Sequence, residues 1–446
     1  MADFEVKDGI AVIPEETEQI GSGAFGDLEG LTTVVIPKSV TKIDAQTGLA
    51  RSSATNVVVE EGNEKYDSRN NCNAIIRTDM NKLYAGCATT IIPDTVEVIG
   101  WGAFRGCEKL TSIVIPNSVK KIEANAFALC KNLASIEIPN SVTEIGESAF
   151  EGCESLTSIV IPDSVCRVEY DAFAGCKNLK SIVIPSTTYL SDSSLTSFSM
   201  TNSMRLPFKD CPALASITIT KGSGEEEYYD SDHDCNAIIE KENNALRLGC
   251  AASVIPDGVA EIDAEAFLGC GGLTSIDIPA SVTKIGESAF KGCTGLNSIT
   301  LPSSVTIIGQ QAFNGCTSLT DVVIPESVTE IGDGAFSGCS CLKSVVLPES
   351  ITTIPWAAFS STGLTEVVIH DQITELKGRA FFGCEALTTI TLPKAVKKID
   401  ERTFEGCTSL KTINVPAKRT DYYKKRLPEN LHGLIVELPA EKKAKK

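Results

Sequence analysis

Apolar residues recur along this chain with a fixed spacing of 23 residues. An Ala-Phe pair marks the repeat at Phe104, Phe127, Phe150 and Phe173, and again at Phe267, Phe290, Phe313, Phe336 and Phe359. Phe381 and Phe404 continue the series after one unit that is shorter by a residue. A fixed period of this length is typical of stacked units, none of which buries its apolar face alone.

Each unit combines a longer and a shorter extended segment. In the unit around residue 150, the stretch 156–162 is rich in β-branched residues and its second half has a period of two. This predicts a strand with Leu156, Ile159 and Ile161 pointing inward. Val142 and Ile145 predict a second, shorter extended segment on the opposite side of the coil. The residues 147–150 between them suit one helical turn, which is too short to be stable without packing.

The repeated motif L-x-x-I-x-I-P-x-S-V-x-x-I-G-x-x-A-F-x-G-C resembles the leucine-rich repeat of BspA-like bacterial surface proteins, over about nine tenths of the chain. The resemblance implies an α/β leucine-rich-repeat solenoid, a curved right-handed superhelix. A long parallel β-sheet would line its concave face, with short strands and helical turns on the convex face. Members of that family are described as surface-displayed or secreted adhesion and interaction proteins, so the resemblance implies such a role.

The repeat also sets the expected domain boundaries. We expect a capping coil over residues 1–30, a solenoid over 31–416, and a C-terminal cap with a basic tail over 417–446. Within the cap, the sequence favours a helix around 422–431 and a closing strand at 434–438. Caps prevent repeat proteins from associating end to end.

Three segments interrupt the period. Residues 57–93 and 221–256 resemble each other, and each is predicted to carry a β-hairpin. A further segment, 186–211, is about 12 residues longer than a normal unit and rich in Ser and Thr, which predicts a surface loop.

Cysteine is abundant, with 17 residues. We expect those that lie three positions after the repeat phenylalanine to be reduced, buried thiols that fill space between coils. These are Cys107, Cys130, Cys153, Cys176, Cys211, Cys270, Cys293, Cys316, Cys339, Cys384 and Cys407. The pairs Cys72/Cys87 and Cys235/Cys250 are each 15 residues apart in the hairpin segments, and the sequence leaves open whether they form disulfides.

Catalytic, metal and cofactor sites find little support in the sequence. The three histidines, His233, His370 and His432, fall in different units, although nucleophilic catalysis needs neighbouring groups. Residues 230–234 resemble the start of a calcium loop, but Cys235 stands where that loop needs glycine. There is no C-x-x-C and no phosphate-binding glycine loop. We therefore expect no enzyme, no metal and no cofactor.

The net charge and the targeting signals bear on which partners the protein binds and where it is located. The net charge is −18, and residues 418–446 carry +5, so residues 1–417 carry −23. An acidic surface repels nucleic acid and anionic lipid. No apolar run reaches the roughly 20 residues needed to span a bilayer. The start MADFEVKDGIAV has no signal-peptide pattern. The location of the protein therefore stays undecided. The resemblance implies a surface or secreted protein, whereas the sequence start favours a cytoplasmic protein or one whose leader was removed.

The best candidate for a binding face is the outward position between the two inward isoleucines of each long strand. The residues at this position are Val114, Glu137, Val160, Val183, Thr218, Asp277, Thr300, Val323, Val346, Val368 and Thr391. The valines favour partner binding or simply satisfy β-propensity, and the hairpins and the 186–211 loop are the rival surface. We expect a monomeric, non-enzymatic scaffold that binds a protein or glycan, in adhesion or host interaction at a bacterial surface. The alternative is a structural, self-assembling repeat protein.

Overall fold

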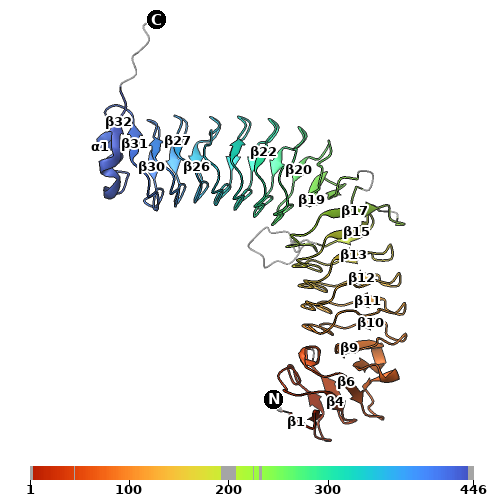
Figure 1. The fold of residues 1–446 in the computed structure, drawn as a ribbon. Coiled ribbons are helices and arrows are strands. Elements are labelled where there is room, and N and C mark those ends of the chain that lie inside the picture. Colours follow the sequence, from red (N-terminus) through yellow and green to blue (C-terminus); the bar gives the residue numbers. More distant parts are fainter. Residues whose placement is uncertain (1–3, 45, 192–206, 225, 231–233, 440–446) are drawn as a thin grey trace. The chain divides into compact units, whose positions relative to one another are not determined.

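The chain folds as a solenoid of stacked coils, each about one repeat long (Figure 1). The computed structural model describes residues 4–44, 46–191, 207–224, 226–230 and 234–439. These fall into two units, Met1–Ser231 and Asp232–Lys446. Strands predominate and the helix content is minor. The expected helical turns are hydrogen-bonded turns rather than helices, as over Glu147–Phe150.

The long strands of successive coils lie on one side of each unit and pair in parallel, apart from the antiparallel β1–β2 pair at the N-terminal end. In the first unit they are β1 (Glu5–Lys7), β2 (Ile10–Val12), β4 (Thr33–Ile36), β6 (Asn56–Val59), β13 (Ser158–Val160), β15 (Ser181–Pro185) and β17 (Ser216–Thr220). In the second unit they are β22 (Ser298–Thr300), β24 (Asp321–Val323), β27 (Glu366–Val368), β29 (Thr389–Thr391), β31 (Thr412–Val415) and β32 (Ile435–Glu437).

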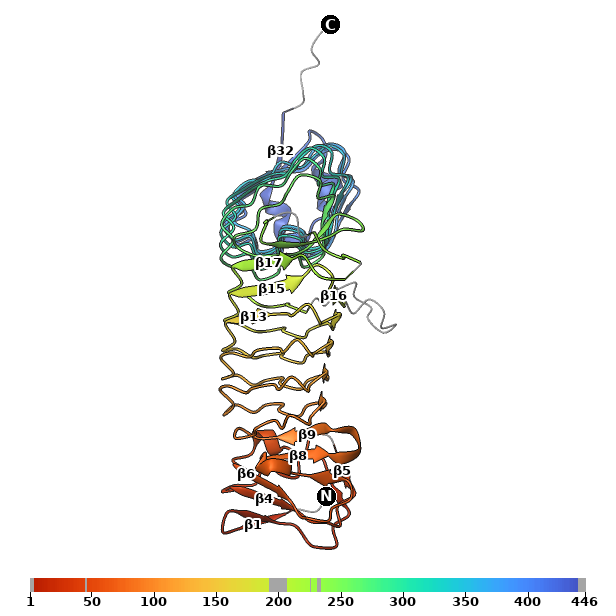
Figure 2. The same cartoon turned by 90° about the vertical axis from the view of Figure 1, so that its right-hand side faces the viewer.

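The short strands form a second ladder on the opposite side of each coil, as β4 and β6 against β5 illustrate (Figure 2). In the first unit they are β3 (Gln19–Ile20), β5 (Lys42–Ile43), β9 (Lys82–Gly86), β10 (Val98–Ile99), β11 (Lys121–Ile122), β12 (Glu144–Ile145), β14 (Arg167–Val168) and β16 (Tyr189–Leu190). In the second unit they are β19 (Ala245–Gly249), β20 (Glu261–Ile262), β21 (Lys284–Ile285), β23 (Ile307–Ile308), β25 (Glu330–Ile331), β26 (Thr353–Ile354), β28 (Glu375–Leu376) and β30 (Lys398–Ile399).

The repeat period sets the register of the stack. Ile122 pairs with Ile145, one period later, and Ile145 pairs with Val168 in the next coil. The glycine that follows many of the short strands lets the coils approach closely at this corner. A Cβ on Gly146 would lie 2.5 Å from the backbone nitrogen of Ala124, so no larger residue fits without a shift.

The core of most coils is a layer of branched apolar side chains beneath a stacked phenylalanine. The predicted inward residues Leu156, Ile159 and Ile161 are all buried. The phenylalanine rings from Phe104 to Phe208 stack with centroids 5.0–5.2 Å apart, and those from Phe267 to Phe404 with centroids 5.0–5.9 Å apart. Such offset aromatic contacts add to the burial of apolar area.

Two coils contain an antiparallel hairpin in place of a simple short strand. In the first unit, β8 (Ala74–Arg77) pairs with β9 and also with β7 (Tyr66–Asp67). In the second unit, β18 (Ala237–Glu240) pairs with β19. Both hairpins have a register shift between the two isoleucines of the first strand, so they share the same irregular geometry.

The remaining elements lie at corners and at the C-terminal end. Short 3₁₀ turns cover Leu49–Arg51, Arg69–Asn71 and Thr78–Met80. After the last coil, α1 (Thr420–Lys424) and a 3₁₀ segment (Glu429–Leu434) lead to β32, which pairs with β31. The helix is shorter and begins earlier than the sequence predicts. The expected 186–211 loop lies largely outside the described residues, at 192–206.

Candidate interaction surface

The outward column of the long strands lies on the surface, as its position between two inward isoleucines requires. Val114, Val323 and Val346 are 82%, 71% and 72% exposed. Glu137, Val160, Thr218, Asp277, Thr300 and Val368 are also exposed, while Val183 and Thr391 are half-buried. Exposed valines in a row are a feature that packing within this chain does not use.

The same column extends to residues that the sequence prediction omitted. Ile91 stands 23 residues before Val114, and Val254 stands 23 before Asp277. Both are exposed, at 72% and 66%. Their 23-residue spacing from known column positions could have identified them. Both residues follow an irregular hairpin, where the repeat motif is harder to recognise.

In the first unit, the part of this column from Ile91 to Glu137 lies in a groove that spans three consecutive coils. The groove has a volume of about 1080 Å³ and is lined by Thr90–Ile92, Asp94, Ser112–Ser118 and Ser135–Asn140. Ile91, Val114 and Glu137 contribute its outward side chains, and Ser112 and Ser135 are exposed beside them. We call this surface the long-strand groove.

The backbone that lines the long-strand groove is not paired as a β-ladder. Residues 111–116 and 134–138 form no strand, although their sequences match that of β13. Among the described residues, no backbone hydrogen bond joins Ser112–Ile115 to Ser135–Ile138, whereas Ser158–Val160 pairs in register with Ser181–Val183. The short-strand ladder stays continuous through the same coils, from β9 to β16. The long sheet is therefore present in segments, and the groove occupies one of the gaps.

The first hairpin closes the edge of the preceding long sheet. The Val57 amide donates to Asn73 Oδ1 at 3.4 Å, and the Val59 amide donates to Ser68 Oγ at 2.9 Å. These side chains satisfy donors that would otherwise meet a neighbouring strand. The hairpin thus ends one segment of sheet just before the groove begins.

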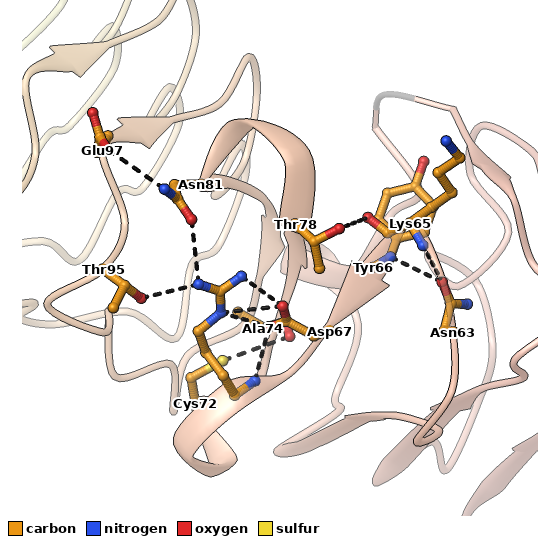
Figure 3. Close-up of polar contacts among 11 residues, drawn as sticks. Asn63, Lys65, Tyr66, Asp67, Cys72, Ala74, Thr78, Asn81, Thr95 and Glu97 are labelled. Atoms are coloured by element: carbon orange, nitrogen blue, oxygen red, sulfur yellow. Dashed lines mark hydrogen bonds and ion pairs between the residues drawn. The ribbon is translucent and has the colours of Figure 1, made fainter.

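Arg69 joins the hairpin to the next coil through hydrogen bonds to Asp67 and Thr95, two residues that Figure 3 labels. Its guanidinium binds Asp67 through two nitrogens, at 2.6 and 2.8 Å, and hydrogen bonding to Asp67 raises the pKa of Arg69. The same guanidinium donates to Asn81 at 3.3 Å and Thr95 at 3.2 Å. Because each of its three nitrogens already donates to a neighbouring side chain, Arg69 has a structural role and offers little to a ligand.

The eleven repeat cysteines form a ladder between coils, in which Cys211 and Cys407 are half-buried and the other nine are buried. Each ladder thiol after the first of a run donates to the carbonyl of the phenylalanine one coil earlier, as Cys130 does to Phe104 at 3.1 Å. Burial raises the pKa of Cys107 and of Cys270 to about 12, so both stay neutral thiols. All 17 cysteines are free in the structure, which includes Cys72, Cys87, Cys235 and Cys250.

The described residues form no cluster of side chains with the geometry of a catalytic or metal-binding site. His432 Nε2 lies 2.9 Å from the Leu427 carbonyl, and the Gln372 amide donates to His370 Nδ1 at 3.3 Å. His233 and part of the acidic 230–234 segment lie outside the described residues. Across the described ranges, no three His, Cys, Asp or Glu side chains gather as a metal site. No helix in those ranges is long and apolar enough to cross a membrane.

The stacked coils, parallel ladders and 23-residue register define a leucine-rich-repeat solenoid. The chain belongs to the BspA type leucine rich repeat family, whose model matches residues 10–82, 75–205, 260–388 and 352–430. No curated protein sequence matches the chain.

Solved structures of bacterial leucine-rich-repeat proteins are similar to it. The pneumococcal vaccine antigen PcpA shares 18% identity at a TM-score of 0.53, covering 98% of this chain and 91% of its own. A leucine-rich repeat protein from Eubacterium ventriosum shares 22% identity at a TM-score of 0.51, covering 76% and 87%. A leucine rich cell surface protein from Faecalibacterium prausnitzii shares 24% identity over 95% and 96%, at a TM-score of 0.46. At these identities, the likeness concerns the fold.

Proposed function

We propose that this protein is a non-enzymatic scaffold that binds an extended segment of a partner protein at the long-strand groove. The observation that carries the proposal is the coincidence of exposed apolar side chains with unpaired backbone. Val114 is 82% exposed and Ile91 72% exposed, and both line the groove. An extended peptide recognises its site through main-chain hydrogen bonds and through pockets for alternate side chains.

The chemistry of the groove favours a peptide over a charged polymer. Among the side chains that line it, Glu137 and Asp94 are the charged ones, and both are acidic. The chain as a whole carries −18, which disfavours nucleic acid and anionic surfaces. Ser112 and Ser135 supply hydroxyl groups beside the apolar column, so a neutral or basic extended segment fits the groove.

Location at a bacterial surface is part of the proposal. Its support is the family, together with solved relatives that include a cell surface protein of Faecalibacterium prausnitzii and a pneumococcal vaccine antigen. Adhesion would follow if the bound segment belongs to another cell. The absence of catalysis is likewise proposed, on the lack of a clustered nucleophile and base among the described residues.

A peptide-display selection on the full chain tests the proposal. Peptides are enriched on the wild-type protein, with counter-selection on Val114→Glu, and their affinities are then measured. The matched control is Val323→Glu, which changes the same column position in the other unit, where Val323 is 71% exposed. Both substitutions are at exposed positions and should leave folding intact.

We expect peptides whose affinity falls about tenfold or more with Val114→Glu, since a carboxylate would be desolvated against apolar side chains. Affinity with Val323→Glu should stay within about twofold. Failure to enrich any peptide, or equal loss with both variants, would contradict the groove as the site.

A further inference from the structure

A second recess in the first unit arises where the phenylalanine column is interrupted. Phe25 stacks on Phe4 at 5.9 Å, and the long run of rings begins again at Phe104. Gly48 stands 23 residues after Phe25, where the repeat would place a ring. A pocket of about 150 Å³ lies at this break. It is lined by Gln46–Arg51, Tyr84, Ala85, Gly102, Ala103, Arg105, Gly106 and Leu129, and we call it the arginine pocket.

The backbone explains why no side chain replaces the missing ring. Gly48 has φ of +85°, in the left-handed region that favours glycine. A Cβ there would lie 2.5 Å from the Gly26 nitrogen, so the two coils meet backbone to backbone. The pocket is therefore a consequence of how the coils pack at this corner.

Two arginines reach this pocket without an acidic partner. Arg51 and Arg105 both line it, and none of its described lining residues is Asp or Glu. Among the described residues, Arg51 forms no ion pair or side-chain hydrogen bond, and Arg105 donates to the neutral amide of Asn125. Elsewhere, the half-buried Arg69 and the buried Arg247 are each paired with an aspartate.

The charge of the pocket contrasts with that of the chain. The whole sequence carries −18, yet both charged side chains that line this pocket are cationic. Guanidinium groups in a recess attract an anion and bind a carboxylate or phosphate through paired hydrogen bonds.

The rest of the wall is mixed. Gln46 and Thr47 are polar, whereas Leu49, Tyr84, Ala103 and Leu129 contribute apolar or aromatic side chains. Among these four, Leu129 is exposed and Tyr84 half-buried, while Leu49 and Ala103 are buried. Inorganic phosphate has no apolar part to place against such a wall. A molecule with an acidic head and a small organic body would use both halves of the pocket.

We propose that the arginine pocket binds a small organic carboxylate, with its carboxylate at Arg51 and Arg105 and its body against Tyr84 and Leu129. This site shares no lining residue with the long-strand groove, so the two proposals can be tested independently of each other. The ligand could be free or the acidic end of a larger molecule, since the recognised chemistry is the same.

Calorimetry with the full chain at low ionic strength tests the proposal, with benzoate, benzamide and inorganic phosphate as probes. Benzoate and benzamide have nearly the same shape, so their difference reports the charge. We expect saturable benzoate binding, at least about tenfold weaker binding of benzamide, and weaker binding of phosphate, because charge-assisted hydrogen bonds and apolar contact both contribute. Equal affinity for benzoate and benzamide, phosphate binding as tight as benzoate, or no saturable benzoate binding would overturn it.

Substitutions in the lining residues test whether benzoate binds at this pocket. Arg51→Gln removes an exposed guanidinium and should weaken benzoate about tenfold, and Ala50→Trp should block the recess while both arginines remain. Arg402→Gln, at an exposed arginine of the other unit, is the matched control and should change nothing. Arg105→Gln also removes the contact to Asn125, so its circular dichroism is checked first. Unchanged binding with both Arg51→Gln and Ala50→Trp would overturn the assignment.

Discussion

The backbone of Gly86 lies directly against the ring of Phe104, so that a Cβ on this glycine would stand 2.2 Å from Cε1 of the phenylalanine. Gly249 has the same relation to Phe267, at 2.1 Å. In both hairpin coils the last strand residue thus supplies the flat surface on which the first ring of a stack rests. The hairpin begins the column of rings as well as ending the previous sheet.

Replacing this glycine should therefore destabilise the unit that it belongs to. We expect Gly86→Ala to lower the free energy of unfolding by about 1–3 kcal/mol, because the added methyl group overpacks a buried contact. Urea denaturation measures the change as a lower midpoint. Gly21→Ala is the matched control, since nothing lies within 4 Å of a Cβ at that glycine. Equal midpoints for the two variants would contradict the packing role.

The cysteine ladder should make stability fall at alkaline pH. Burial raises the pKa of Cys107 and Cys270 from 9.0 to about 12, whereas an unfolded chain releases these protons at the ordinary value. Their contribution is fully present below pH 9 and is lost as pH rises toward 12, since only the unfolded state gains the charge. Each thiol contributes a slope of at most about 1.4 kcal/mol per pH unit.

Alanine variants isolate that slope from the titration of other groups. The decline in urea midpoint between pH 8 and 10.5 should be shallower for Cys107→Ala than for the wild type. Cys341→Ala, which removes an exposed thiol, should decline in parallel with the wild type. Parallel declines for all three proteins would show that the buried thiol does not contribute.

Thr362 takes the place of a ladder cysteine in its coil. Its hydroxyl donates to the Phe359 carbonyl at 2.8 Å and lies 3.2 Å from Cys384 Sγ. We expect Thr362→Val to cost about 1 kcal/mol in the free energy of unfolding, because a buried hydrogen bond is lost without a change of shape. Thr362→Cys restores the residue of the other coils and should cost less. A thermal or urea unfolding series that ranks the two in the opposite order would contradict the hydrogen-bonding role.

Arg69 should hold the first hairpin against the coil that follows it. Arg69→Met removes hydrogen bonds to Asp67, Asn81 and Thr95, and we expect a loss of about 1–2 kcal/mol. Hydrogen exchange of the β8 and β9 amides should rise with it. Arg77→Met breaks a more exposed ion pair with Asp79 in the same hairpin and should lower the stability less than Arg69→Met does. Similar exchange in both variants would argue against the role of Arg69.

The alternative of self-assembly is tested by the mass of the full chain in solution. The C-terminal end is closed by β32, which pairs with β31, and by the buried Tyr423, whose hydroxyl donates to the Pro393 carbonyl. We therefore expect light scattering to give the mass of one chain, 47.4 kDa. A concentration-dependent increase in mass would favour assembly over a separate partner.

The period was the part of the structure that the sequence encoded most directly. Residues 23 apart, such as Ile122 and Ile145, pair because each coil must bury the same side chains as the last. The gap in the long sheet was not predictable, since the unpaired segment Ser135–Ile138 and the paired β13 have nearly the same residues. The arginine pocket was also missed, because it depends on where Arg51 and Arg105 meet in space and not on any motif.

The stacking of Phe173 on Phe208 indicates how a repeat protein of this kind can accept insertions during evolution. The two rings lie 5.2 Å apart, as neighbours in adjacent coils do, although 35 residues separate them in the sequence. A coil is thus defined by the few residues that touch its neighbours, and the length of chain between them is free to vary. New sequence can be spliced into one turn while every other turn keeps its place, so a foreign epitope inserted after Ser191 should be displayed without redesign of the scaffold.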